Sequence, residues 1–213
     1  MKKGLLMAGI AVMFVACGAK KENQEEAAVA VEATTNNTVA VKAAESQVFW
    51  KGYKVTGQHE GTIALTEGNL TFADQVLTGG SFTVDMTSLV ATDLDGEMKG
   101  KLEGHLKSDD FFGTEAHPTA QLVITQVGVD AAGGYQVTGD LTIKGITQPV
   151  SFPMTVADNT AKASLKIDRT LYDIRYGSNN FFENLGDKAI NNEFDATEYL
   201  TKGKILGKIM RYW

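Results

Sequence analysis

Cysteine, histidine and proline are scarce in this chain of 213 residues, and the first two shortages exclude classes of protein. The sequence holds one cysteine, three histidines and three prolines. A single cysteine cannot form an internal disulfide, so a hydrophobic core must hold the fold together. The histidines His59, His105 and His117 lie far apart, with no cysteine partner and no His-x-x-x-His repeat. Their spacing therefore predicts no metal site.

Sequence motifs for catalysis and phosphate binding are absent as well. The chain has no Gly-x-Ser-x-Gly turn and no glycine-rich phosphate loop ahead of a helix. Asp109 and Asp110 are adjacent, but neighbouring side chains of an extended segment point in opposite directions and cannot share a substrate. The sequence thus favours a protein that is not an enzyme and needs no cofactor.

The chain also lacks an excess of positive charge. Its formal net charge is -6 at pH 7. An acidic protein is not attracted by charge to nucleic acid or to anionic lipid. We therefore expect no nucleic-acid partner.

No apolar run is long enough to span a bilayer, but a shorter run follows the first residues. Lys2 and Lys3 precede the apolar residues 5–16, a length typical of a signal-peptide core. A small residue stands before Cys17, and this resembles the signal of bacterial lipoproteins, in which the cysteine becomes the lipid-bearing N-terminus. We expect residues 1–16 to be a signal peptide and Cys17 to anchor an exported protein to a membrane of the bacterial periplasm or cell envelope.

The next segment has the composition of a linker. Residues 17–45 are rich in Ala, Glu, Val, Thr and Asn, contain no aromatic residue and show no apolar periodicity, so they predict a flexible tether with a reach of roughly 30 Å. Residues 46–200 are long enough for one domain with a substantial core. Residues 201–213 form a basic amphipathic tail, which we expect to be frayed or packed on the domain; an interfacial helix is the alternative.

Alternation with a period of two residues is the clearest structural signal in the domain. It is strongest over 135–144 and 150–156, and it recurs over 63–72, 82–86 and 163–167. Pro153 cannot donate a ladder hydrogen bond, which predicts a sheet edge or bulge near it. Eight or nine short strands with brief turns predict an all-β, closed antiparallel barrel.

Two irregular segments interrupt this pattern. Over 95–112, Met98, Leu102, His105 and Leu106 have helical spacing, and Asp95 is suited to cap a short helix. The loop after this helix contains one Phe-Phe pair, and the segment 177–186 contains another. We expect both long connections to fold over an end of the barrel; burial in an ordinary core explains the aromatic pairs equally well.

Several motifs resemble the YceI-like family of lipid- and polyisoprenoid-binding proteins. The resemblance runs from about Gln47 to Leu200. Its motifs are HEGT at 59–62, GSFTVDM at 80–86, HLKSDDFF at 105–112 with Pro118, GDLTIKGITQPV at 139–150, and IDRT at 167–170 with Tyr172. The resemblance implies an eight-stranded, lipocalin-like barrel in the bacterial envelope with an elongated apolar cavity for a long isoprenoid or similar lipid.

From the alternation and this resemblance we select ligand-lining candidates, each of which is equally suited to a filled core. They are Phe82, Val84, Met86, Leu106, Phe111, Phe112, Leu122, Ile124, Leu141, Ile143, Phe152, Met154, Leu165, Tyr172 and Phe181. His59, His105 and Arg169 are candidate contacts for a polar head group, although Arg169 is also placed to pair with Asp168 or Asp173.

Two other functions remain open at this stage. A barrel filled by its own side chains would act as an envelope interaction or stress module without a lipid. An enzyme would use His59 and His105 as acid–base groups on a bound lipid. The sequence leaves the oligomeric state open between a monomer and a homodimer.

Overall fold

The structure of the protein is a computed structural model that describes residues 36–202. The predicted signal peptide 1–16, Cys17 with its predicted lipidation, the first part of the predicted tether and residues 203–213 of the predicted tail lie outside the described residues.

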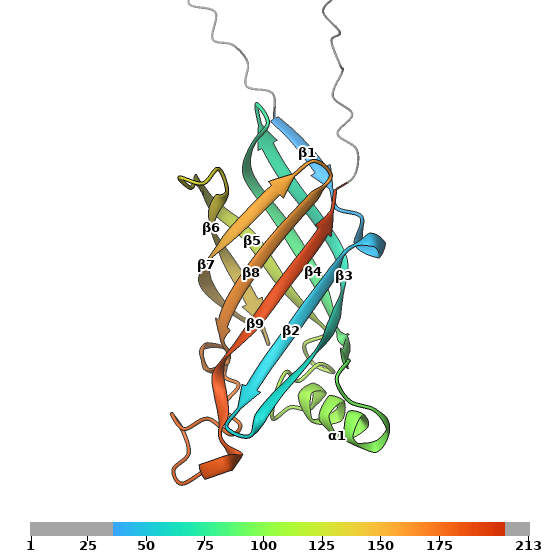
Figure 1. The fold of residues 1–213 in the computed structure, drawn as a ribbon, viewed down its shortest axis with the longest axis vertical. Helices are drawn as coiled ribbons and strands as arrows, with labels where there is room; N and C mark the ends of the chain where they lie inside the picture. The colour runs from blue at the N-terminus through green and yellow to red at the C-terminus, as the bar shows by residue number, and fades with distance from the viewer. Residues whose placement is uncertain (1–35, 203–213) are drawn as a thin grey trace, which may run out of the picture. The chain divides into compact units, whose positions relative to one another are not determined.

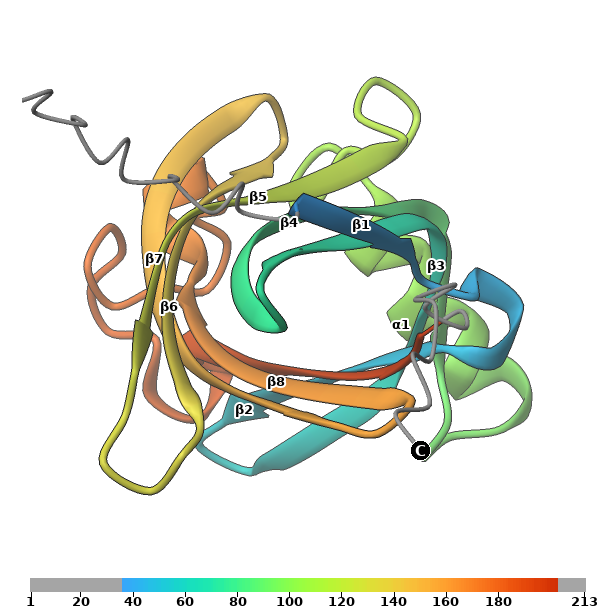
Figure 2. The same cartoon turned by 90° about the horizontal axis from the view of Figure 1, so that it is seen from above.

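Nine antiparallel strands and one α-helix make up the described part of the chain (Figure 1). The strands form one sheet in the order β1-β3-β2-β9-β8-β7-β6-β5-β4, and β3 also pairs with β4, which closes a barrel of eight strands (Figure 2). The all-β, closed antiparallel barrel predicted from the alternation is confirmed, and so is the number of eight barrel strands that the family resemblance implies. The strands are β1 (Asn36–Ala40), β2 (Gln47–Lys54), β3 (Gly57–Ala73), β4 (Val76–Ala91), β5 (Thr119–Val129), β6 (Tyr135–Ile143), β7 (Ile146–Ala157), β8 (Thr160–Asp168) and β9 (Ile190–Thr201).

The ninth strand, β1, pairs with the part of β3 that does not pair with β2. β1 pairs with residues 69–73 of β3, whereas β2 pairs with residues 57–63. Val39 and Val41 are buried in the core. The prediction that the tether continues to residue 45 is therefore wrong, because β1 and the segment that follows it belong to the barrel domain. The alternation around Val39 and Val41 is short and lies in a segment without aromatic residues, so the composition of this segment resembles that of a linker.

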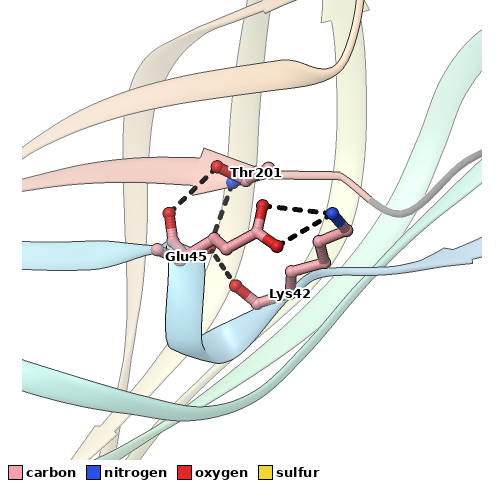
Figure 3. A network of polar contacts seen from close by, with 4 residues as sticks. Lys42, Glu45 and Thr201 are labelled. Atoms are coloured by element: carbon pink, nitrogen blue, oxygen red, sulfur yellow. Dashed lines mark hydrogen bonds and ion pairs between the residues drawn. The ribbon is translucent and has the colours of Figure 1, made fainter.

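A short 3-10 helix, η1 (Ala43–Glu45), joins β1 to β2 and is fastened to the end of β9. Thr201 Oγ1 donates to the Glu45 carbonyl at 2.9 Å, and Lys42 N donates to the Thr201 carbonyl at 2.8 Å. Lys42 Nζ lies 2.9 Å from the Glu45 carboxylate (Figure 3). Ser46 Oγ accepts from Thr201 N at 3.0 Å. Backbone pairing and these polar contacts together close this end of the barrel.

The barrel wall has a seam between β7 and β8. These two strands pair only through residues 154–157 and 160–163. Pro153 is the first residue of β7 outside this pairing. Proline has no N–H group, and at this position none is needed for a hydrogen bond to β8. The predicted sheet edge near Pro153 is confirmed. The 3-10 helix η2 (Arg169–Tyr172) approaches β7 beside the seam, where Gln148 Nε2 donates to the Leu171 carbonyl at 3.4 Å.

The predicted helix is also present, as α1 (Gly96–Lys107), at the opposite end of the barrel from β1 (Figure 1). Asp95 occupies the N-cap position, but its side chain makes no capping hydrogen bond. Only Leu106 of the predicted apolar face is fully buried; Leu102 packs against the core and Met98 is 62% exposed. The three glycines in this helix and its one buried residue indicate that packing at Leu106, rather than helix propensity, holds it in place.

The inward faces of the strands form one continuous hydrophobic core. Most of the candidates selected from the alternation belong to it, and Val84 packs against it while partly exposed. Their inward orientation is confirmed; their contact with a ligand stays a prediction. The buried candidates are Phe82, Met86, Leu106, Phe111, Phe112, Leu122, Ile124, Leu141, Ile143, Phe152, Met154, Leu165 and Tyr172.

Candidate functional site

The α1 end of the barrel contains an apolar cavity and a wider groove that share part of their walls. The cavity has a volume of about 60 Å³ and the groove about 370 Å³. The residues common to both are Trp50, Gly52, Tyr53, Leu106, Phe111 and Ile190. The groove therefore leads from the surface to the wall of the cavity.

Phe111 and Phe112 close the barrel at this point. The chain leaving α1 turns sharply, because Phe112 N donates to the Leu106 carbonyl at 3.1 Å and Phe111 N donates to the Ser108 carbonyl at 3.0 Å. The two rings meet edge to face at 5.1 Å, and the Phe112 ring lies 6.2 Å from that of Phe194 on β9. Side chains of a loop, rather than a β ladder, thus separate the cavity from the groove.

Two ring nitrogens beside this closure are buried without a hydrogen-bond partner. Trp50 Nε1 and His105 Nε2 are both in this condition. The His105 ring lies between Phe111 at 5.7 Å and Tyr176 at 4.4 Å. A buried polar atom without a partner destabilises the ligand-free protein, and a polar group entering the groove would give it one.

His59 lies in the groove wall but already has a partner. Its Nδ1 is 2.8 Å from Asp93 Oδ2, and Glu60 N donates to Asp93 Oδ1 at 3.2 Å. Partial burial raises the pKa of Asp93, but the hydrogen bonds from His59 and Glu60 outweigh this effect and hold the pKa below its usual value. His59 is thus oriented by Asp93, while His105 is held by ring contacts.

Arg169 lines the cavity as a buried cation. It is 2% exposed, and it donates to the carbonyls of Asn191, Ile174 and Ile190 at 2.9, 2.7 and 3.1 Å. Burial lowers its pKa. Its guanidinium also stands 5.5 Å from the centre of the Phe111 ring.

The alternative that Arg169 pairs with a local acid is wrong. Asp168 accepts from Thr170 instead, and Asp173 pairs with Arg175 at 2.7 Å. Three backbone carbonyls replace a carboxylate as the partners of Arg169. The charge of Asp168 still acts on Arg169 and tends to raise its pKa, and Glu193 lines the same cavity, but neither carboxylate forms an ion pair with the guanidinium.

The other candidates fall outside the two hollows. Phe181 is 45% exposed, and the guanidinium of Arg175 lies 5.0 Å from the centre of its ring. The expectation that both Phe-Phe pairs fold over the barrel end is therefore wrong for the second pair. Tyr172 is fully buried beside the cavity wall, and its hydroxyl has no partner; burial raises its pKa to about 12. His117 packs against Gly113 and Gly145. Among the lining candidates, only Leu106, Phe111 and Phe112 line the cavity.

Several residues of the site were missed by the sequence analysis. Trp50, Leu89, Ile190 and Phe194 line the cavity. Trp50 packs directly on Gly61, where an added Cβ would overlap its ring. The alternation of Val48 with Trp50 was a usable signal; the positions of Ile190 and Phe194 depend on how β9 crosses the barrel.

Neither a metal centre nor a helical membrane span is found between residues 36 and 202. In this part of the chain, no three His, Cys, Asp or Glu side chains are grouped to hold a metal ion. No helix described there has the length and apolar character needed to cross a bilayer.

Comparison with known proteins gives three kinds of match: curated relatives, solved structures and a family model. A UPF0312 protein of Photorhabdus laumondii is 37% identical over 90 residues, which cover 42% of this chain and 44% of that protein. One of Shewanella denitrificans is 45% identical over 47 residues, 22% of this chain and 25% of the relative. The chain thus matches less than half the length of these curated relatives.

Two solved structures share the fold. Burkholderia cenocepacia BcnA superposes with a TM-score of 0.63 at 22% identity, covering 77% of this chain and 99% of BcnA. A polyisoprenoid binding domain from Saccharophagus degradans, implicated in plant cell wall breakdown, gives a TM-score of 0.55 at 14% identity, with 78% and 98% covered. At these identities the similarity establishes the fold alone. The model of the YceI-like domain matches residues 39–197, nearly the whole described barrel, and the chain therefore belongs to the YceI-like domain family.

Proposed function

We propose that the protein binds a long isoprenoid or similar lipid chain through the α1 end of its barrel and does no chemistry on it. The observation that carries this proposal is the apolar cavity joined to a surface groove, with unpartnered nitrogens of Trp50 and His105 at the junction. The family and the fold shared with a polyisoprenoid binding domain support it.

The size of the cavity sets a condition on how binding occurs. A volume of 60 Å³ is room for about two water molecules, which is too little for a lipid chain. One isoprene unit buries roughly 100 Å² of apolar surface and contributes about 2.5 kcal/mol, whereas association costs about 4–15 kcal/mol. A ligand needs several units, so the described conformation is the closed one and must open to admit it.

Phe111 and Phe112 are the side chains that have to move. Their backbone N–H groups form only local turns, and Lys144 Nζ donates to the Asp109 carbonyl of the same loop at 2.8 Å, so displacing the two rings breaks no strand pairing. Behind them the chain would meet the core residues selected from the alternation, such as Leu141, Phe152 and Leu165. These residues would then become the lining that the sequence analysis expected.

The head group would stay in the groove. His59 and His105 line it together with Lys54, Lys188 and Asp187. Imidazole and ammonium groups donate hydrogen bonds to hydroxyl, carbonyl or phosphate oxygens. The groove therefore suits a polar head group, and Arg169 supplies a positive charge just inside it.

The place of binding in the cell is also part of this proposal. We infer that Cys17 is lipidated after removal of residues 1–16 and holds the barrel at a membrane of the bacterial envelope. Such an anchor would keep the open end within reach of membrane lipid.

The proposal is tested by the dependence of affinity on chain length. Isoprenoid alcohols of one, two, four and eight units are titrated into the full-length protein carrying Trp213→Phe, so that the fluorescence of Trp50, its other tryptophan, reports binding beside the cavity. We expect affinity to rise with length until the barrel is full. Equal affinity for the shortest and the longest chain would refute the proposal.

One observation favours a second function. The core residues away from α1 line neither hollow, which suits a filled barrel that acts through its surface. A filled barrel predicts that no chain of any length changes the Trp50 signal. The paired changes His59→Gln and His105→Gln test the enzyme alternative: a binder should retain its lipid in this variant, whereas an enzyme should lose turnover of the lipid.

A further inference from the structure

A carboxylic acid lies inside the barrel, well away from the groove. Glu198 is 7% exposed and stands on the inner face of β9, one residue from the outward-facing Tyr199 and two from the buried Leu200. The residues directly opposite it are Val48 on β2 and Ala163 on β8, both buried. Glu198 is thus surrounded by the apolar core.

The carboxyl group has no partner for its buried oxygen. Oε2 of Glu198 makes no hydrogen bond, and no ion pair involving Glu198 is found among residues 36–202. The buried cation next along the chain, Lys202, lies over the Phe72 ring at 5.5 Å instead. Burial raises the pKa of Glu198 to about 7, so about half of the molecules carry a protonated carboxyl at neutral pH.

A purely structural role does not explain an acid at this position. A leucine or methionine would fill the same space without an unpartnered oxygen, and buried polar groups in native proteins are normally hydrogen-bonded. An unsatisfied group in a native core often belongs to a site whose ligand supplies the missing bond.

The inner face of β9 connects this acid to the cavity. Phe194 lines the cavity, and Glu198 follows four residues later, about 13 Å further along the strand. Between them lies Ala196, opposite Trp50 and Leu165. Ala196, and Ala163 opposite Glu198, are small side chains along this line, and a lipid chain that entered from the cavity would follow it to Glu198.

We propose that Glu198 is an inner specificity-determining residue, which hydrogen-bonds an uncharged hydroxyl group on the inserted end of the lipid and rejects an anionic end. This proposal rests on the proposed lipid-binding function. A hydroxyl both donates and accepts, so it pairs with the carboxyl in either protonation state. A phosphate or carboxylate there would meet a like charge in an apolar interior, and an anionic head group would remain at the mouth near Arg169.

The test compares two chains of equal length. Radiolabelled geranylgeraniol and the corresponding hydrocarbon are partitioned from phosphatidylcholine vesicles into the full-length protein. The wild type is compared with Glu198→Gln, which keeps hydrogen-bonding groups, and with Glu198→Leu, which removes them. Glu67→Leu is the control, because Glu67 is an exposed acid of the barrel wall.

We expect the wild type to prefer the alcohol by about tenfold, as one buried hydrogen bond implies. The preference should persist in Glu198→Gln and Glu67→Leu and disappear in Glu198→Leu. Infrared difference spectra provide a second readout: the alcohol, but not the hydrocarbon, should shift the carbonyl band of protonated Glu198, and the band should be absent in Glu198→Gln.

The outcomes separate this inference from the proposed function. If both chains bind but the wild type shows no preference, or Glu198→Leu retains it, the role of Glu198 is refuted while lipid binding stands. An unshifted infrared band would likewise refute it and leave water as the partner of the acid. If neither chain binds the wild type, both proposals fail.

Discussion

The two ends of the barrel are closed by different means. At the β1 end, closure comes from backbone pairing of β1 with β3 and from the contacts of Lys42 and Glu45 with Thr201. At the α1 end, it comes from the rings of Phe111 and Phe112 on a loop. Ladder hydrogen bonds must break together, whereas a ring can rotate away. This difference is what the proposed function requires, with one end serving stability and the other serving ligand entry.

Removing β1 should give the largest effect. A chain that begins at Ser46 loses the burial of Val39 and Val41 together with five ladder pairings. We expect the free energy of unfolding to fall by about 3–6 kcal/mol, as measured by urea denaturation. A chain that begins at Thr34 is the control and should match the full-length protein. A barrel of unchanged stability would show that β1 is not part of the closed end.

Phe111→Ala should affect the other end in a different way. Loss of a buried ring costs about 3–5 kcal/mol of stability. Because the same ring blocks the cavity, the association rate of a long isoprenoid alcohol should increase, as followed by stopped-flow fluorescence of Trp50. Leu77→Ala, in the core of the β1 end, is the control and should lower stability without faster uptake. Equal rates in both variants would contradict entry at the α1 end.

Glu198, which lies between the two ends of the barrel, should make the free energy of unfolding depend on pH. Burial raises the pKa of Glu198 from 4.5 to about 7, so the folded state holds a proton that the unfolded state releases. With respect to Glu198, the free energy of unfolding is therefore highest below pH 4.5. It falls as the pH rises, and it is lower by roughly 3 kcal/mol once the pH exceeds the pKa of Glu198 in the folded state. Urea denaturation of wild type and Glu198→Gln across this range should show the loss only in the wild type. Parallel curves would place the acid in contact with water.

The polar contacts at the β1 end should give the smallest effect. Thr201→Val removes the hydrogen bond from Thr201 Oγ1 to the Glu45 carbonyl and should lower the free energy of unfolding by about 1 kcal/mol. Thr201→Ser keeps the hydroxyl and should remain close to wild type. A larger loss in Thr201→Ser than in Thr201→Val would show that packing of the methyl group, rather than the hydrogen bond, holds η1.

The sequence predicted the fold more completely than the site. Alternation identifies an inward face because a strand buries every second side chain, and Leu141, Phe152 and Leu165 are accordingly in the core. It does not say whether that face encloses a hollow, since a filled and a lined barrel use the same residue types. Phe111 and Phe112 belong to the motif shared with the family; a pair of rings in a loop does not by itself predict burial, because Phe181 and Phe182 are 45% and 49% exposed.

The missed features depend on contacts between distant segments. Trp50 and Phe194 meet at the cavity only because β2 pairs with β9. Glu198 stands in the stretch Ala196-Thr197-Glu198-Tyr199, where an acid beside polar neighbours gives no sign of burial. The composition of β1 does not distinguish it from a linker, because its five residues have small side chains.

Native mass spectrometry is the most direct test of lipid binding by this barrel. The full-length chain with Cys17→Ser, which prevents covalent attachment of lipid, would be produced with export in bacteria and purified without detergent. We predict a discrete added mass that organic extraction removes and identifies as an isoprenoid lipid. A bare protein mass, with no uptake of added long-chain isoprenoids, would contradict the account and favour a filled barrel that acts through its surface.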